Sequence, residues 1–252
     1  MGSIKLDGNT LSTTEIALVA MGETVEVAAD AWLKIEASRS VVEGILERGE
    51  TVYGINTGFG ALVSESISPA ELVNLQVNLI RSHACAIGEA MSINDTRAMM
   101  CVRANSLIKG HSGIQRSVIE QLISYLNQNI VPVVPRIGSL GASGDLAPLS
   151  HMALALIGEG EVWGDEGPVN TSQILREKGL IAVDLAAKDG LSLINGTSQM
   201  CSLLVNAEMR LSNLLPLADL IACASIEARE CSIRPMDPRV HKERPHHGQS
   251  LV

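Results

Sequence analysis

The sequence predicts a mainly α-helical fold with little β-strand. Apolar residues recur at helical spacing in most segments of the 252-residue chain. Residues that start or stop helices stand at the ends of several of these segments. Only short stretches near residues 51–61, 131–144 and 158–180 are typical of extended structure. Strands are therefore expected to play a minor part.

The N-terminal part of the chain contains the first expected helices. Residues 14–48 hold two helical patterns, and the second ends at a glycine that suits the end of a helix. Residues 67–88 predict a third helix. Its start at Ser68-Pro69 combines a capping serine with proline at the first helical position.

Two further helices are expected in the middle of the chain. Residues 93–113 predict a helix with Asn94 or Asp95 as its cap and Gly110 as its stop. Residues 113–130 predict the next helix, which is followed by an extended, proline-bounded approach to a cluster of small residues.

The C-terminal half begins with a helix expected over residues 145–157, and a short strand and a short helix follow within 158–180. A loop over 190–200 leads into a long helix over 198–230, in which Pro216 is expected to cause a kink or a break. This helix is apolar around much of its circumference. It therefore needs partners on several sides, which indicates oligomerisation or a further portion of chain.

Composition argues against several classes of function. The net charge is −9, the basic residues are scattered and aromatic residues make up 2% of the chain, so no nucleic-acid partner is expected. No apolar run is expected to span a membrane, and the N-terminus lacks the pattern of a secretory signal. The cysteines form no CxxC pair, which predicts reduced, mostly buried thiols in a cytoplasmic protein without a metal site. They are Cys85, Cys101, Cys201, Cys223 and Cys231.

The small residues gather at 138–145, GSLGASGD, immediately before a helical pattern. Glycine has no Cβ, so the backbone nitrogen of Gly144 can approach the carbonyl carbon of Ala142 in a tight turn. Closure would give a five-membered ring. The ring would then lose one water, and the Ser143 hydroxyl would leave as a second water. The product would carry an exocyclic C=C. That group is an electrophile, which no encoded side chain provides.

A simpler interpretation of the same tripeptide is an ordinary tight turn before a helix, and the tripeptide alone leaves both open. Asp145 would help to position the start of the helix, and its carboxylate could assist proton transfer. The spacing of the glycines matches neither of the common phosphate-binding loops.

The full string GSLGASGDLAPLSHMALALIGEG (138–160) resembles the signature of the aromatic amino acid ammonia-lyases and the related aminomutases. Four other segments are similar to segments of that family and follow in the same order. They are YGINTGFG (53–60), NLIRSHACAIGE (78–89), LINGTSQM (193–200) and RPHHGQ (244–249).

The resemblance implies that Ala142-Ser143-Gly144 cyclises to 4-methylideneimidazole-5-one (MIO), with no external cofactor and no metal. It also implies an N-terminal MIO-bearing domain over 1–200 and the start of a long central helical bundle over 201–252. The expected substrate is a small aromatic amino acid, and the expected assembly is a homotetramer. The expected reaction is the elimination of ammonia to give an α,β-unsaturated acid.

The resemblance also assigns roles to single residues. Tyr53 lies where the family has its general base, a role that requires nearby donors or positive dipoles to favour the phenolate. Gly60 is expected to bring the backbone close to the MIO. The Asn195 amide is expected to donate to the MIO carbonyl oxygen. His83 is expected to face the side chain of the substrate.

His83 is the residue that bears on substrate choice. A histidine can hydrogen-bond to an imidazole or a phenol but offers nothing comparable to a phenyl ring. This disfavours phenylalanine. The Ser-His-Ala sequence around His83 most resembles that of histidine ammonia-lyases, and this resemblance places histidine ahead of tyrosine. The sequence NGTSQ at 195–199 differs from the shorter NGTQ motif associated with bacterial histidine lyases, which weakens the preference for histidine. A tyrosine or phenylalanine ammonia-lyase or aminomutase therefore remains an alternative.

Family chains are about twice as long as this one. Their second half contributes a Tyr and an Arg that bind the substrate carboxylate. Two hypotheses follow. The chain is part of a histidine ammonia-lyase-type enzyme and is inactive alone, or it is a non-catalytic fragment or assembly partner in which Ala142-Ser143-Gly144 stays uncyclised.

Overall fold

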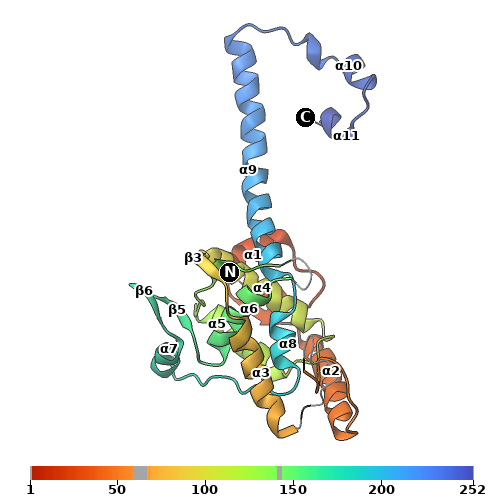
Figure 1. Cartoon of the computed structure of the whole chain (residues 1–252). Helices are drawn as coiled ribbons and strands as arrows, with labels where there is room; N and C mark the ends of the chain where they lie inside the picture. The colour runs from red at the N-terminus through yellow and green to blue at the C-terminus, as the bar shows by residue number, and fades with distance from the viewer. Residues whose placement is uncertain (1, 59–66, 68, 141–143, 252) are drawn as a thin grey trace. The chain divides into compact units, whose positions relative to one another are not determined.

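The computed structural model describes residues 2–58, 67, 69–140 and 144–251 (Figure 1). By its internal contacts the chain divides into two compact units, Met1–Asn206 and Ala207–Val252. The prediction of a mainly α-helical fold with little strand is confirmed. The assignment of 201–252 to a central helical bundle stays a prediction.

The first unit contains helices joined by short strands. Its helices are α1 (Thr13–Ala20), α2 (Ala29–Glu47), α3 (Pro69–His83), α4 (Ile93–Ile108), α5 (Arg116–Asn127), α6 (Leu146–Leu156), α7 (Thr171–Lys178), α8 (Asp189–Ile194) and the start of α9 (Ser198–Ala228). Its strands are β1 (Ile4–Leu6), β2 (Val25–Val27), β3 (Ile87–Ala90), β4 (Pro135–Ile137), β5 (Glu161–Gly164) and β6 (Gly167–Asn170).

The strands of the described residues form three separate two-stranded sheets. β1 pairs with β2 in parallel, and β5 forms an antiparallel hairpin with β6. The antiparallel pair β3–β4 matters most for function, because it aligns Ile87 with Ile137 and Ala90 with Pro135. It thereby brings the chain that follows α3 beside the chain that enters the small-residue cluster.

The core of the first unit forms around α4. This helix is buried on nearly every side and packs against α1, α2 and α5. Its fully buried side chains include Met99, Met100, Cys101, Ala104 and Ile108. Burying side chains of this size is worth about 1.5–3 kcal/mol each, so α4 is the main hydrophobic element of this unit.

The second unit, Ala207–Val252, contains the rest of α9, a 3₁₀ turn η2 (Arg234–Met236), and two short helices, α10 (Pro238–Lys242) and α11 (His247–Leu251). Its side chains are nearly all exposed, including a set of large apolar ones on α9. They are Leu211, Leu214, Leu215, Leu217, Leu220 and Ile221.

Two predicted helix boundaries were wrong. The helix expected over 67–88 ends at His83, because Gly88 has φ +85°, a value outside the helical range, and lies in strand β3. The cap of α4 is Ser92, whose hydroxyl accepts the Asp95 amide, and neither Asn94 nor Asp95 takes that role.

Two features of the C-terminal half also differ from expectation. The loop expected over 190–200 contains the one-and-a-half-turn helix α8. The break expected at Pro216 was wrong, because α9 runs through it to Ala228, while the kink expected as the other outcome stays a prediction. A proline removes one main-chain donor, and the remaining bonds of a helix this long keep it continuous.

The predicted burial of the cysteines was also wrong. Cys101 is buried and Cys201 half-buried, while Cys85, Cys223 and Cys231 are exposed. The prediction assumed that free thiols lie in the core. Cys223 is exposed because it belongs to α9, whose apolar side chains are themselves exposed.

We expected no apolar segment long enough to span a membrane, and this was wrong, because one helix has the length and the composition to do so. Within the described residues, α9 alone is long and apolar enough, with a mean hydropathy of 1.3 over its best window. The same properties suit a helix that packs against others in an assembly, as the resemblance implies for this segment.

A buried cation, Arg97 of α4, joins several segments of the first unit. Its guanidinium donates to the carbonyl oxygens of Val19, Glu23 and Leu126 and to the Asn129 side chain, at 2.8–3.1 Å. Val19 and Leu126 lie in the last turns of α1 and α5. The negative ends of two helix dipoles thus compensate this charge, although burial lowers the pKa of Arg97.

We expect Arg97→Met to lower the free energy of unfolding by about 3 kcal/mol, because several buried oxygens lose a charged donor. Chemical denaturation followed by circular dichroism measures the change. Arg116→Met is the matched control, since the Arg116 side chain is 48% exposed, lies over the ring of half-buried Trp32 and should contribute less than about 1 kcal/mol. Equal losses in the two variants would contradict this account of Arg97.

Candidate active site

The small-residue cluster is closed into a narrow loop by its two ends. The amide of Leu140 donates to the carbonyl of Gly144, and the amide of Gly144 donates to the carbonyl of Leu140, both at 3.0 Å. This reciprocal pair forms an antiparallel bridge between Leu140 and Gly144. Ala142, Ser143 and Gly60 lie outside the described residues.

Gly144 occupies a position that only glycine can take. Its φ is +85°, and a Cβ there would overlap the carbonyl oxygen of Gly196. The backbone of Gly144 forms a parallel bridge with Gly196, and the amide of Asp145 donates to that carbonyl oxygen at 2.6 Å. The loop that precedes α6 is therefore attached to the loop that precedes α9.

Asp145 is fully buried and binds both sides of this junction. Its Oδ1 accepts the Ser139 hydroxyl at 2.6 Å, and its Oδ2 accepts the Met200 amide at 3.0 Å. The residue lies at the cap position of α6, but its side chain makes no bond to that helix. Its carbonyl oxygen accepts the Leu149 amide of α6 at 3.0 Å, while its carboxylate holds the first turn of α9.

Asn195 ends helix α8 and has an exposed side chain. Its carbonyl oxygen accepts Nη2 of Arg103 at 3.0 Å, and the same nitrogen contacts the carbonyl of Ser192. Arg103 belongs to α4 and is only 4% exposed. The residue expected to supply an amide donor is therefore held through its main chain.

His83 is the last residue of α3 and is half-buried. Its Nδ1 lies 2.9 Å from the Leu79 carbonyl oxygen. A carbonyl only accepts, so Nδ1 carries the hydrogen and Nε2 of the neutral ring is an acceptor. After His83 the chain leads to Ala86. Ala86 lies close to Gly138, since a Cβ added to Gly138 would be only 2.9 Å from the Ala86 Cβ.

Tyr53 lies in a turn and is 59% exposed. The side chain of Asn56 holds this turn, since it accepts the Val52 amide at 2.9 Å and donates to the Glu50 carbonyl at 2.7 Å. Gly54, with φ +77°, packs so closely on α8 that a Cβ there would be 2.9 Å from Leu191. The turn of Tyr53 thus rests on the helix that ends at Asn195.

Helices α3, α6 and α8 pack against one another (Figure 1). His83 stands at the end of α3, Gly144 and Asp145 at the start of α6, and Asn195 at the end of α8. Of the predicted residues, the structure joins Gly144 and Asp145 to the Gly196 turn directly. It attaches the turn of Tyr53 to α8.

A family model described as aromatic amino acid lyase matches residues 11–252. The chain belongs to the aromatic amino acid lyase family. The predicted resemblance is confirmed, while the roles of the single site residues stay predictions.

Several relatives illustrate the match. The histidine ammonia-lyase of Myxococcus xanthus is 42% identical over 99% of this chain and 49% of its own length. The MIO-dependent tyrosine 2,3-aminomutase of Streptomyces globisporus is 42% identical over 98% of this chain and 46% of its own length. The crystal structure of histidine ammonia-lyase from Trypanosoma cruzi superposes with a TM-score of 0.90 at 38% identity, covering 99% of this chain and 49% of that chain. The chain thus spans about half the length of the curated relatives it matches.

Two residues that hold the candidate site were missed from the sequence. Arg103 stands in the apolar stretch MMCVRANSLI, and a charge inside such a stretch is a signal for a buried, paired cation. Asn56 follows Tyr53 within GINTG, where an asparagine that binds nearby backbone is typical of turns.

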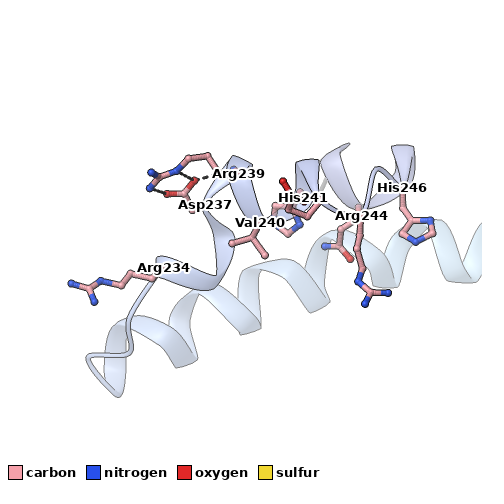
Figure 2. A pocket seen from close by; sticks show the side chains of 9 residues that line it. Arg234, Asp237, Arg239, Val240, His241, Arg244 and His246 are labelled. Atoms are coloured by element: carbon pink, nitrogen blue, oxygen red, sulfur yellow. Dashed lines mark hydrogen bonds and ion pairs between the residues drawn. The ribbon is translucent and has the colours of Figure 1, made fainter.

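The second unit has a hollow of its own (Figure 2). Its lining includes Arg234, Arg239, His241, Arg244 and His246. Figure 2 shows Arg239 paired with Asp237 across two short contacts. None of the predicted site residues lines this hollow. Among the described residues, no group of three or more His, Cys, Asp or Glu side chains could hold a metal ion.

We expect Gly144→Ala to destabilise the protein by at least about 2 kcal/mol more than Gly179→Ala. Both glycines have positive φ, but the space around Gly179 is open, whereas a Cβ at Gly144 would overlap the Gly196 carbonyl. Chemical denaturation of the two variants gives the difference. An equal loss of unfolding free energy in the two variants would contradict this, because it would mean that the Gly196 backbone moves away from the added Cβ without an energetic penalty.

Proposed function

We propose that this chain carries the electrophile-forming part of a histidine ammonia-lyase-type enzyme, which converts L-histidine to trans-urocanate and ammonia. The observation that supports this most is the loop closed by Leu140 and Gly144 and attached to Gly196. These contacts fix the backbone at Gly144, whose nitrogen would close the ring within Ala142-Ser143-Gly144. The names of the relatives point to the same chemistry.

Ring closure is balanced by the loss of two waters. The Gly144 nitrogen bonds to the Ala142 carbonyl carbon, and that oxygen leaves with the amide hydrogens of Ser143 and Gly144. Ser143 then loses its hydroxyl and its Cα hydrogen as the second water. Gly144 suits this reaction, since its missing Cβ leaves the nitrogen accessible. Once formed, MIO supplies an electrophilic carbon for the substrate amine.

The chain's own side chains would do the remaining work. In this proposal Tyr53 removes the proton from the substrate β-carbon, and the turn held by Asn56 fixes its main chain. The Asn195 side-chain amide would donate a hydrogen bond to the ring carbonyl oxygen, where negative charge develops. The substrate carboxylate would be bound by groups outside these 252 residues, in a homotetramer.

Histidine is preferred as substrate because of the bonding of His83. Its Nδ1 is occupied by the Leu79 carbonyl, so Nε2 remains to accept a hydrogen from the imidazole of the substrate. A tyrosine hydroxyl could donate to the same atom, and a tyrosine aminomutase is among the relatives. Tyrosine is therefore the second candidate. A phenyl ring would leave Nε2 unpaired.

One observation favours the uncyclised alternative. The Gly144 amide already donates to the Leu140 carbonyl, and this bond is lost when the nitrogen gives up its hydrogen. A hydrogen bond of this kind contributes about 1 kcal/mol, which is small compared with a covalent ring. Cyclisation is therefore not prevented by it.

Intact mass distinguishes the two states. We expect the 252-residue chain to be about 36 Da lighter than its sequence mass, because two waters leave. Ser143→Ala should restore the full mass, since alanine has no hydroxyl to lose. A full-mass protein, together with lyase activity in the presence of the missing half, would contradict the proposal.

Substrate choice is tested with the companion half supplied. We expect His83→Leu to lower kcat/KM for histidine by about 10–100-fold, the cost of leaving a buried polar group of the substrate unpaired. Activity is followed by the absorbance of urocanate, with coumarate and cinnamate as products of the alternatives. His111→Leu, at an exposed position, is the control. Unchanged discrimination in His83→Leu would remove His83 from the substrate site.

A further inference from the structure

Arg103 is a buried cation that the proposed chemistry does not use. Its Nη2 contacts the carbonyl oxygens of Ser192 and Asn195, and its Nε is buried without a partner in the described part of the chain. No carboxylate of the described residues forms an ion pair with it. Burial lowers its pKa to about 10. Among the described residues, the groups that face this charge are main-chain carbonyls.

The compensation comes from the end of helix α8. The last carbonyls of a helix have no partner within the helix and carry the negative end of its dipole. Ser192 and Asn195 are such carbonyls, and Arg103 binds both. The guanidinium therefore fixes where α8 ends, and with it the main chain of Asn195.

Gly196 links this cation to the electrophile-forming loop. A Cβ at Gly196 would overlap the Arg103 guanidinium, so the backbone turn lies directly against the cation. On its other side, the Gly196 carbonyl oxygen accepts the Asp145 amide at 2.6 Å and the backbone pairs with Gly144. A continuous set of contacts runs from Arg103 through Gly196 to Gly144.

We propose that Arg103 is a positioning residue for the loop that forms the electrophile: it holds the Asn195-Gly196 turn, and that turn holds Gly144 and Asp145. This inference rests on the proposed function only for its catalytic consequence. Its structural consequence, the fixed Gly196 carbonyl, is independent of MIO.

The chain offers a matched control on the same helix. Arg97 is also a buried α4 arginine that binds main-chain carbonyls, but its partners are Val19, Glu23 and Leu126, which belong to other helices and loops. Loss of either guanidinium should lower overall stability. Only the loss of Arg103 should release the Asp145 amide.

The test compares Arg103→Met, Arg103→Lys and Arg97→Met in the 252-residue chain by two measurements. Hydrogen exchange of the Asp145 amide, resolved by NMR, should be about tenfold faster in Arg103→Met than in the unsubstituted chain under native conditions. The fraction of chains that are lighter by two waters should fall in parallel. Arg103→Lys should lie between, because an ammonium keeps the charge but cannot match the planar guanidinium. Arg97→Met should leave the lighter fraction unchanged.

Each outcome decides the inference. Arg103→Met with unchanged Asp145 exchange overturns it, and so does Arg97→Met if it accelerates that exchange equally. If Arg103→Met does not fold, Arg103→Lys is compared with Arg97→Lys. Equal exchange rates of the Asp145 amide in these two lysine variants would overturn the inference. An unsubstituted chain of full mass would count against the proposed function, while Asp145 exchange would still decide the role of Arg103.

Discussion

The short hydrogen bond between the Asp145 amide and the Gly196 carbonyl is the constraint on which the site depends. It requires two backbones to meet without a side chain between them, and this explains glycine at 144, where a Cβ would overlap the Gly196 carbonyl. Glycine at 196 is required by the Arg103 guanidinium, which a Cβ there would overlap. It also places the start of α6 beside the start of α9. The buried carboxylate of Asp145 then satisfies the Met200 amide, so the same residue joins both helices. Packing of α3, α6 and α8 surrounds this junction.

Much of the fold and part of the site follow from local sequence. The helices could be predicted because each buries a face that recurs at helical spacing, and the positive φ of Gly144 suits the tight turn expected there. Helix ends were predicted less well. Ser92, Asn94 and Asp95 are all good caps, and only the structure distinguishes them.

The remaining features depend on contacts that the sequence does not encode locally. Arg97 and Arg103 both stand among apolar residues of α4, and no local pattern separates them. They differ in which helix ends approach them, which is a property of the tertiary fold. The carboxylate of Asp145 is a similar case, since its partner Met200 comes from a helix far along the chain. Pro216 was judged by its local effect, whereas the length of α9 decides the outcome.

Burial divides the site into two sets of residues with different physical requirements. Asp145 and Arg103 are buried, and they fix the loop by contacts that lie entirely within residues 1–206. Tyr53 and Asn195 are exposed. A hydrogen-bond donor stabilises developing charge most where water is excluded. Under the proposed function, ring formation therefore needs only this chain, whereas turnover needs further protein to cover Tyr53 and Asn195.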